Sequence, residues 1–199
     1  MSGDAAAPVV DIRGAGGYKR SRPMSSDEDL LRAAGNGDPG AFRVLVDRHS
    51  RELHGYFRRR AGPQAAEDLL QETFLRLHRA AARFTPQGTF RAFLYTIARN
   101  LALNHARDRH PAAALDGGPP PAAHAPSPPE SIESAERAGA VRSAVEGLSD
   151  VLRDVVLLRH YQGLSFKEIA AVLDIPEGTA MRRMADALLR LKDHLRDLP

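Results

Sequence analysis

Two runs of sequence separated by a short break decide the fold: residues 67–79 read E-D-L-L-Q-E-T-F-L-R-L-H-R, and residues 90–107 read F-R-A-F-L-Y-T-I-A-R-N-L-A-L-N-H-A-R. Apolar residues recur in each run at the spacing of a stripe on one face of a helix. The stripe of the first run is Leu70, Phe74, Leu77 and Ala81, and that of the second is Phe90, Leu94, Ile97 and Leu101. The spacing therefore predicts two helices that bury these stripes in a core.

The opposite face of the first helix is polar except at one position. Leu75 falls there among Asp68, Gln71, Glu72 and Arg79. An exposed leucine surrounded by an acid, an amide and an arginine is typical of an anchor for another protein. Single leucines are also common on ordinary surfaces, so the spacing alone leaves both interpretations open.

One flank of the second helix carries four side chains of different chemistry: Phe93, Thr96, Asn100 and Arg107. An aromatic ring can stack on a base, a hydroxyl or an amide can bond to a base edge, and a guanidinium can hold a phosphate. This flank is therefore a candidate nucleic-acid surface. The competing interpretation is that Phe93 simply widens the buried stripe.

Near the C-terminus the sequence has the pattern of a helix-turn-helix. Ser165 and Glu168 have the spacing of a capping box, Asp174 and the next residue form a turn, and Pro176 opens a second helix. Such a second helix enters the major groove of DNA. Its expected outward face is Thr179, Arg182, Arg183, Asp186 and Arg190, and its expected core face is Ala180, Met184, Ala187, Leu188 and Leu191. The alternative is a solvated face with ion pairs one turn apart.

Capping and breaking residues mark the remaining helices. A short helix begins at Ser25 or Ser26, and a longer one begins after Asp38 and ends before Gly62-Pro63. The arginines at residues 58–60 either complement the dipole of that helix or contact phosphate. Helical spacing returns after residue 134, with an expected buried stripe at Leu148, Val151, Leu152, Val155 and Leu158.

These segments resemble regions 2 and 4 of bacterial sigma factors, in the extracytoplasmic-function (ECF) group of the sigma-70 family. D-L-L-Q-E-T-F-L-R (68–76) resembles the segment that docks on the β′ subunit of RNA polymerase. F-R-A-F-L-Y-T-I-A-R-N-L-A-L-N (90–104) resembles the segment that melts and recognises the promoter −10 element, and residues 163–184 resemble the helix-turn-helix that recognises the −35 element. The resemblance implies an all-α protein of two small helical domains, with no cofactor and no metal.

The resemblance also implies three sets of site residues. The core polymerase set is Asp68, Leu69, Gln71, Glu72, Leu75, Arg76 and Arg79. The −10 set is Pro86, Gln87, Thr89, Arg91, Phe93, Thr96, Arg99, Asn100, Asn104 and Arg107, where the loop at 85–89 would capture a flipped base. The −35 set is Ser165, Lys167, Glu177, Gly178, Thr179, Met181, Arg182, Arg183 and Asp186.

The chain departs from the family pattern at a few of these positions. The family usually has Trp where this chain has Phe93, although a smaller ring can still stack on a base. It commonly follows Gly-Thr with Val-Lys-Ser-Arg-Leu, whereas this chain has A-M-R-R-M at 180–184, and a basic residue is frequent where Asp186 stands. We therefore expect an unusual −35 preference.

Composition predicts the domain organisation. Residues 1–24 are rich in Gly, Ala, Ser and Pro and read as a disordered tail, although Met24 is an alternative to Met1 as the start of translation. The resemblance assigns residues 25–107 to region 2 and residues 135–199 to region 4, each expected to be a separate domain. Between them, residues 108–134 are a flexible Pro/Ala-rich linker, which could span several tens of ångströms at about 3 Å per residue.

Composition also limits the class of protein. The absence of cysteine excludes disulfides and thiolate zinc sites. No apolar run is long enough to span a membrane and the start lacks the pattern of a signal peptide, so we expect a cytoplasmic protein, associated with the nucleoid through RNA polymerase. The eight histidines are scattered, and neither a phosphate-binding glycine loop nor a metalloprotease pair appears. We therefore predict no enzymatic activity for the chain alone.

Together these observations predict an ECF sigma factor that binds the β and β′ subunits of core RNA polymerase, directs it to promoter DNA and is regulated by an anti-sigma factor. Two other binding proteins remain as alternatives. One is a self-sufficient helix-turn-helix regulator, in which Leu75 and its neighbours would be incidental. The other is a sigma-like decoy that occupies an anti-sigma factor; Met181 and Asp186 hint at it, whereas the intact flank around Phe93 argues against it.

Overall fold

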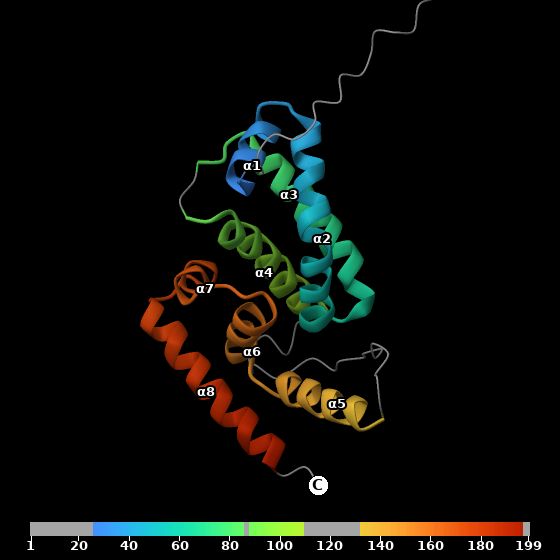
Figure 1. Cartoon of the computed structure of the whole chain (residues 1–199), viewed down its shortest axis with the longest axis vertical. Helices are drawn as coiled ribbons and strands as arrows, with labels where there is room; N and C mark the ends of the chain where they lie inside the picture. Colours follow the sequence, from blue (N-terminus) through green and yellow to red (C-terminus); the bar gives the residue numbers. More distant parts are fainter. Residues whose placement is uncertain (1–25, 86–87, 110–131, 197–199) are drawn as a thin grey trace, which may run out of the picture.

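The computed structural model describes residues 26–85, 88–109 and 132–196, and within these ranges every regular element is a helix (Figure 1). The first group is α1 (Asp27–Gly35), α2 (Pro39–Ala61), α3 (Pro63–Ala81) and α4 (Phe90–Arg109). The second group is α5 (Ile132–Glu146), α6 (Asp150–Val156), the π-helical turn η2 (Leu157–Tyr161), α7 (Phe166–Leu173) and α8 (Glu177–Arg196). The all-α class predicted from the sequence is confirmed.

The helices α1 and α2 begin where capping residues predicted, whereas α3 begins four residues before the expected Glu67. The side chain of Ser26 accepts a hydrogen bond from the backbone N–H of Asp29, and the side chain of Asp38 accepts from two N–H groups in the first turn of α2. Between α2 and α3, Gly62 has a φ of 88°, a conformation that a residue without a side chain adopts without strain. Pro63 then begins α3, because its fixed φ suits the first turn of a helix.

The helices α2, α3 and α4 bury aromatic and leucine side chains in a common core. Tyr56, Phe57, Leu77 and Phe90 have no exposed surface. The rings of Tyr56 and Tyr95 meet edge to face with their centroids 5.5 Å apart, a favourable geometry for aromatic pairs. This core holds α3 and α4 in fixed orientations, so that their outer faces are presented on a rigid support.

The second group is built around α6 and η2, whose apolar side chains Val155, Leu157 and Leu158 are fully enclosed. The capping box predicted at Ser165 is present, with both of its reciprocal hydrogen bonds to Glu168. After α7 the chain turns into α8 through a left-handed residue at position 174. The structure therefore contains the predicted helix-turn-helix, formed by α7 and α8 (Figure 1).

The π-helical turn η2 shifts the hydrogen-bond register after α6. The N–H of Gln162 donates to the carbonyl of Leu157 at 3.1 Å, one residue further back than in an α-helix. The next residues leave the helix, and the side chain of Gln162 reaches the hydroxyl of Tyr95 on α4. The turn thus links the second group to the first.

The two groups pack against each other, which the sequence analysis did not predict. The helix α7 lies against α4 (Figure 1), and η2 contacts α2. A single apolar cluster contains Tyr95 and Leu101 from the first group and Leu158 and Leu164 from the second. Both ends of the expected linker are helical, because α4 continues to Arg109 and α5 begins at Ile132. The expected N-terminal tail and most of the linker lie outside the described residues.

Two residues expected in the core are exposed. Val151 is 44% exposed because it lies in the first turn of α6, where it lines a hollow between α6 and α8. Leu188 is 53% exposed because it follows the buried Ala187, and one residue turns a side chain about 100° around the helix. In both cases the apolar stripe is narrower than the sequence suggested.

Candidate polymerase-binding and nucleic-acid interfaces

The outer face of α3 presents the predicted polymerase-binding residues. Leu75 is 52% exposed, and Asp68 and Gln71 are exposed on the same helix. Arg76 donates to the carboxylate of Glu72 at 2.7 Å, which is an ion pair one turn apart. The face therefore combines an apolar side chain with flanking polar groups, the composition of a protein-binding anchor.

Leu69, which the resemblance placed in the polymerase set, lies inside the protein. Its side chain is 7% exposed and belongs to the apolar core. It follows Asp68 by one residue, and that step turns its side chain away from the polar face. The exposed face of α3 therefore excludes Leu69.

Beside this face, α3, α4 and the segment between them surround a hollow of about 760 Å³. Three arginines and two phenylalanines contribute to its wall: Arg76, Arg79, Arg83, Phe84 and Phe93. The rings of Phe84 and Phe93 lie with their centroids 5.2 Å apart. Since guanidinium groups hold phosphates and aromatic rings stack on bases, the hollow has the chemistry to receive an unpaired nucleotide.

Part of the predicted base-capturing loop lines the same hollow. Thr85, Gly88 and Thr89 contribute to its wall, whereas Pro86 and Gln87 lie outside the described residues. The hydroxyl of Thr89 accepts a hydrogen bond from the N–H three residues later and so caps the first turn of α4. The described part of the loop therefore lies at the same hollow as Phe93, and its capture of a base stays a prediction.

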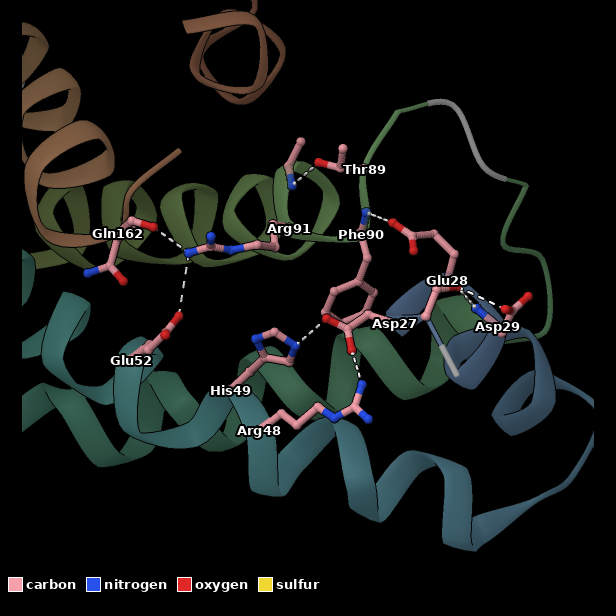
Figure 2. Close-up of polar contacts among 12 residues, drawn as sticks. Asp27, Glu28, Asp29, Arg48, His49, Glu52, Thr89, Phe90, Arg91 and Gln162 are labelled. Carbon is pink, nitrogen blue, oxygen red and sulfur yellow. Dashed lines mark hydrogen bonds and ion pairs between the residues drawn. The ribbon is translucent and has the colours of Figure 1, made fainter. Parts of the chain in front are cut away.

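The start of α4 is held in place by α1 and α2 (Figure 2). The carboxylate of Glu28 accepts a hydrogen bond from the backbone N–H of Phe90 at 2.7 Å. Asp27 lies 2.8 Å from Nε2 of His49, and the His49 ring packs on the Phe90 ring with centroids 5.0 Å apart. These contacts fix the first turn of α4 and hence the position of Phe93 beside the hollow.

Further along α4, the predicted −10 residues keep to one flank. Asn100, Asn104 and Arg107 are exposed, and Arg107 donates to the side-chain oxygen of Asn104. Thr96 is half-buried, and its hydroxyl donates to the carbonyl of Ala92 at 2.8 Å. The flank therefore continues the polar surface that starts at Phe93.

Arg91 and Arg99, also in the predicted −10 set, are held by the second helical group. The Nε of Arg99 donates to the carboxylate of Asp154 at 2.8 Å. Arg91 lies between the carboxylate of Glu52, 3.5 Å away, and the backbone oxygen of Gln162, to which it donates (Figure 2). In this arrangement both guanidinium groups already have protein partners.

Arg60, at the end of α2, is buried where the two groups meet. Its Nε donates to Asp154 at 2.8 Å, and its Nη2 lies 3.3 Å from Asp150. Burial opposes the charge of the guanidinium and is the largest single effect, but the combined electrostatic effect of Asp154, Tyr56 and Asp150 outweighs it, so that the pKa of Arg60 is raised above its ordinary value. Arg60 is therefore charged, paired and enclosed, and it does not offer the phosphate contact considered from the sequence.

The helix-turn-helix divides the predicted −35 set. The exposed members are Ser165, Lys167, Glu177, Gly178, Met181, Arg182 and Asp186, whereas Thr179 and Arg183 are half-buried. Arg183 and Asp186 line the hollow between α6 and α8 together with Val151. Arg182 is exposed but does not line that hollow. The outward side of α8 therefore has two edges: one carries Arg183 and Asp186 and borders the hollow, and the other carries Arg182.

Sequence reasoning missed the residues that depend on long-range packing. Arg60 and Asp154 are 94 residues apart in the chain, and no local pattern connects them. Arg83 and Phe84 in the hollow were missed for a different reason: they lie between the apolar stripe of α3 and the loop, and so they belong to neither pattern. Their position directly before the loop could have indicated that they belong to the same site. Within the described ranges, no group of histidine, aspartate or glutamate side chains is placed to hold a metal ion.

Comparison with family models identifies both helical groups. The Sigma-70 region 2 model matches residues 45–111, and the Sigma-70, region 4 model matches residues 138–191. The RNA polymerase sigma-H factor of Pseudomonas aeruginosa is 34% identical over 175 residues, which cover 81% of this chain and 89% of that protein. The ECF RNA polymerase sigma-E factor of Escherichia coli (strain K12) is 32% identical over 172 residues, covering 80% of this chain and 88% of that protein. The chain belongs to the ECF group of the sigma-70 family.

Solved structures support the fold of this ECF sigma factor. CnrH in complex with the cytosolic domain of CnrY matches with a TM-score of 0.67 and 25% identity, covering 86% of this chain and 98% of CnrH. The sigma factor RpoE of Bartonella quintana, in complex with the anti-sigma factor NepR, matches with a TM-score of 0.66 and 23% identity, covering 79% and 98% of the two chains. The predicted family and fold class are thus confirmed. In addition, no described helix has the length and apolar character needed to cross a membrane.

Proposed function

We propose that this ECF sigma factor binds core RNA polymerase through the outer face of α3, at Leu75 and the neighbouring side chains of Asp68, Gln71 and Glu72. The observation that carries the proposal is Leu75, which is 52% exposed on a helix whose opposite side is firmly packed. Burying such a side chain in a partner removes apolar surface from water, while the polar rim sets the orientation of docking.

Region 2 then opens the −10 element by capturing one strand. A base that leaves the duplex stacks on Phe93 in the hollow between α3 and α4, and Arg83 with Arg79 holds its phosphate. Stacking on an aromatic side chain is worth about 1–3 kcal/mol per base, which is comparable with the cost of unstacking. Asn100 and Arg107 continue this surface along α4.

Region 4 binds the −35 element through α8. The exposed guanidinium of Arg182 is suited to guanine or phosphate in the major groove. Arg183 and Asp186 lie on the edge that faces α6, so they contribute less to base contacts than Arg182 does. The unusual −35 preference expected from the sequence therefore rests on Met181, which is 47% exposed beside Arg182.

The partners follow from the same reasoning. The β and β′ subunits of core polymerase, promoter DNA and an anti-sigma factor are the expected partners, the last because the similarly folded RpoE of Bartonella quintana is seen with the anti-sigma factor NepR. The chain acts in the cytoplasm, needs no cofactor, and leaves the chemistry of transcription to the polymerase.

Co-elution with sigma-free core RNA polymerase on a sizing column tests the proposal. We expect the wild type to co-elute and Leu75→Arg to lose at least tenfold in affinity, because the substitution places a charge in the buried centre of the contact. Leu195→Arg is the matched control, since Leu195 is 37% exposed on α8 and lies outside the proposed surface. In run-off transcription on genomic fragments, the wild type and Leu195→Arg should be active and Leu75→Arg should lose activity.

Two outcomes would contradict the proposal. If the chain fails to co-elute but binds specific duplex DNA tightly by itself, it is a self-sufficient helix-turn-helix regulator. If it co-elutes but supports no run-off transcription from any fragment, it is a sigma-like decoy.

A further inference from the structure

Two neighbouring side chains of α2 share one carboxylate of α1. One oxygen of Asp27 lies 2.7 Å from a guanidinium nitrogen of Arg48, and the other lies 2.8 Å from Nε2 of His49 (Figure 2). A carboxylate accepts hydrogen bonds and does not donate them, so Nε2 of His49 carries the donated hydrogen. The side chain of His49 is only 10% exposed, and the bond to Asp27 therefore orients a ring that is nearly buried.

The ring of His49 connects this carboxylate to α4. Its centroid lies 5.0 Å from that of the Phe90 ring, with the two planes tilted by 41°, and Phe90 has no exposed surface. Closely packed rings transmit a displacement, because a protein interior leaves little empty space in which a side chain can adjust. The position of the Phe90 ring therefore depends on Asp27 through His49.

The backbone of Phe90 is held from the same turn of α1. The carboxylate of Glu28 accepts a hydrogen bond from the Phe90 N–H at 2.7 Å (Figure 2). Asp27 and Glu28 are consecutive, so one turn of α1 holds both the side chain and the main chain of the residue that begins α4. Such packing and hydrogen bonds from outside a site are what hold its side chains in a productive geometry.

Phe93, on which the unpaired base is proposed to stack, follows one turn later. Its N–H donates to the carbonyl of Thr89 at 3.2 Å, which closes the first turn of α4 around Phe90. Its ring lines the hollow between α3 and α4 beside Phe84. A shift of Phe90 therefore displaces Phe93 as well. A ring that is already in place loses less conformational freedom when a base arrives.

We propose that Asp27 and His49 are positioning residues for promoter opening, because they hold Phe90 so that Phe93 is ready to receive a base that leaves the duplex. The inference rests on the proposed function, since it takes Phe93 to be the stacking surface. Neither side chain touches DNA, and both act through Phe90. Their loss should slow strand capture without weakening the binding of core polymerase, which uses the outer face of α3.

Asp27→Ala removes the carboxylate that orients His49. Asp29→Ala is the matched control, because Asp29 lies in the same first turn of α1 but pairs with Arg32 of its own helix. Both substitutions remove one negative charge from the start of α1, so only the contact with α2 distinguishes them. Asp27→Asn is the conservative variant; its amide oxygen still accepts from Nε2 of His49, and it should retain most of the activity.

A second variant tests whether Asp27 acts through His49. His49→Phe keeps a ring against Phe90 but loses the bond to Asp27. If the two residues form one link, the double variant Asp27→Ala/His49→Phe should lose no more activity than either single variant. Losses that multiply in the double variant would show independent roles and overturn the proposal.

Run-off transcription from two templates separates positioning from folding. The first is a duplex genomic fragment from which the wild-type holoenzyme makes product, and the second is the same fragment with mismatched bases across its −10 element. On the duplex, we expect Asp27→Ala and His49→Phe to lower the initial rate about tenfold, as for the loss of a hydrogen bond to a charged group. On the mismatched template we expect a loss of less than about threefold, because those bases are already unpaired. Asp29→Ala should match the wild type on both templates.

The other outcomes would overturn the positioning role. Equal losses on both templates, or weaker co-elution with core polymerase, would show that Asp27 and His49 only stabilise region 2. Unchanged rates on the duplex would remove the positioning role and leave the sigma function intact. Should Asp27→Ala lose its helical circular dichroism, His49→Phe and Asp27→Asn decide the matter. If the wild type makes no product from any fragment, the proposed function fails, and the positioning role fails with it.

Discussion

Glu28 shows how a single side chain outside the −10 surface can position it. Its carboxylate accepts the hydrogen bond of the Phe90 N–H at the first turn of α4, where an unpaired donor would otherwise remain (Figure 2). We expect Glu28→Ala to lower the free energy of unfolding by about 1 kcal/mol, as for the loss of other helix caps. Glu28→Gln should lose less, because its amide oxygen still accepts. Urea unfolding of the wild type, Glu28→Ala and Glu28→Gln measures these free energies. If both variants lose the same free energy of unfolding, the effect of Glu28 comes from its charge and not from its hydrogen bond.

Glu168 is a second residue whose side chain serves two helices. Its carboxylate accepts from the N–H and the hydroxyl of Ser165, both at 2.8 Å, and from the Thr89 hydroxyl. Partial burial opposes ionisation, but these hydrogen bonds outweigh it, so the pKa of Glu168 lies below its usual value. A pKa lowered by folding stabilises the protein above the unfolded-state pKa, and this stabilisation is lost as the pH falls through the folded-state pKa.

The lowered pKa of Glu168 should make part of the free energy of unfolding depend on pH. Between about pH 7 and about pH 3, the wild type should lose more free energy of unfolding than Glu168→Gln, in which position 168 cannot titrate. Urea unfolding at the two pH values gives the comparison. If both chains lose stability in parallel, ionised Glu168 does not stabilise the fold.

At the scale of elements, α1 and α3 approach each other closely at Gly35. A Cβ added at Gly35 would lie 2.3 Å from the backbone oxygen of Ala81, and backbone cannot yield as a flexible side chain can. We expect Gly35→Ala to lower the free energy of unfolding by about 1–3 kcal/mol, the usual range for overpacking. Gly139→Ala on α5 is the control, because nothing lies within 4 Å of its added Cβ.

That control should change stability in the opposite direction. Alanine restricts the unfolded chain and favours a helix, so Gly139→Ala is expected to raise the free energy of unfolding by about 0.5–1 kcal/mol. Thermal and urea unfolding of Gly35→Ala and Gly139→Ala, each compared with the wild type, measure the two changes in stability. A Gly35→Ala chain as stable as the wild type would show that α1 can shift relative to α3 without loss.

The individual helices were largely predictable, because local chemistry sets their ends. Asp38 and the Ser165 capping box each act within a few residues and begin a helix as predicted, and Gly62-Pro63 separates two helices as predicted, although α3 begins at Pro63, earlier than the expected start at Glu67. The faces of the helices were less predictable, since periodicity gives the direction of an apolar stripe but not its width. Leu69 is buried and Leu188 is exposed for this reason: each lies at the edge of a stripe, where the neighbouring helices decide burial.

The candidate site also has parts that could be predicted from the sequence and parts that could not. Leu75 and the polar face of α3 could be predicted from spacing and resemblance, and the structure leaves that face exposed. The contact between the two helical groups could not, because it joins α2 and α4 to α6 across the expected linker. A buried pair such as Arg60 and Asp154 leaves no periodic or local signal in the sequence.

At the scale of the whole molecule, this contact should make unfolding cooperative. The apolar cluster runs through both groups, and Asp154 adds two ion pairs between them, so neither group keeps its full core when the other unfolds. We expect one calorimetric transition for the wild type, with equal calorimetric and van't Hoff enthalpies. In Asp154→Asn the groups should uncouple and give two transitions, while Asp193→Asn, the same change at an exposed residue of α8, should retain one. Two resolved transitions in the wild type would show that regions 2 and 4 are independent domains, as the sequence suggested, and that the buried ions contribute no coupling between them.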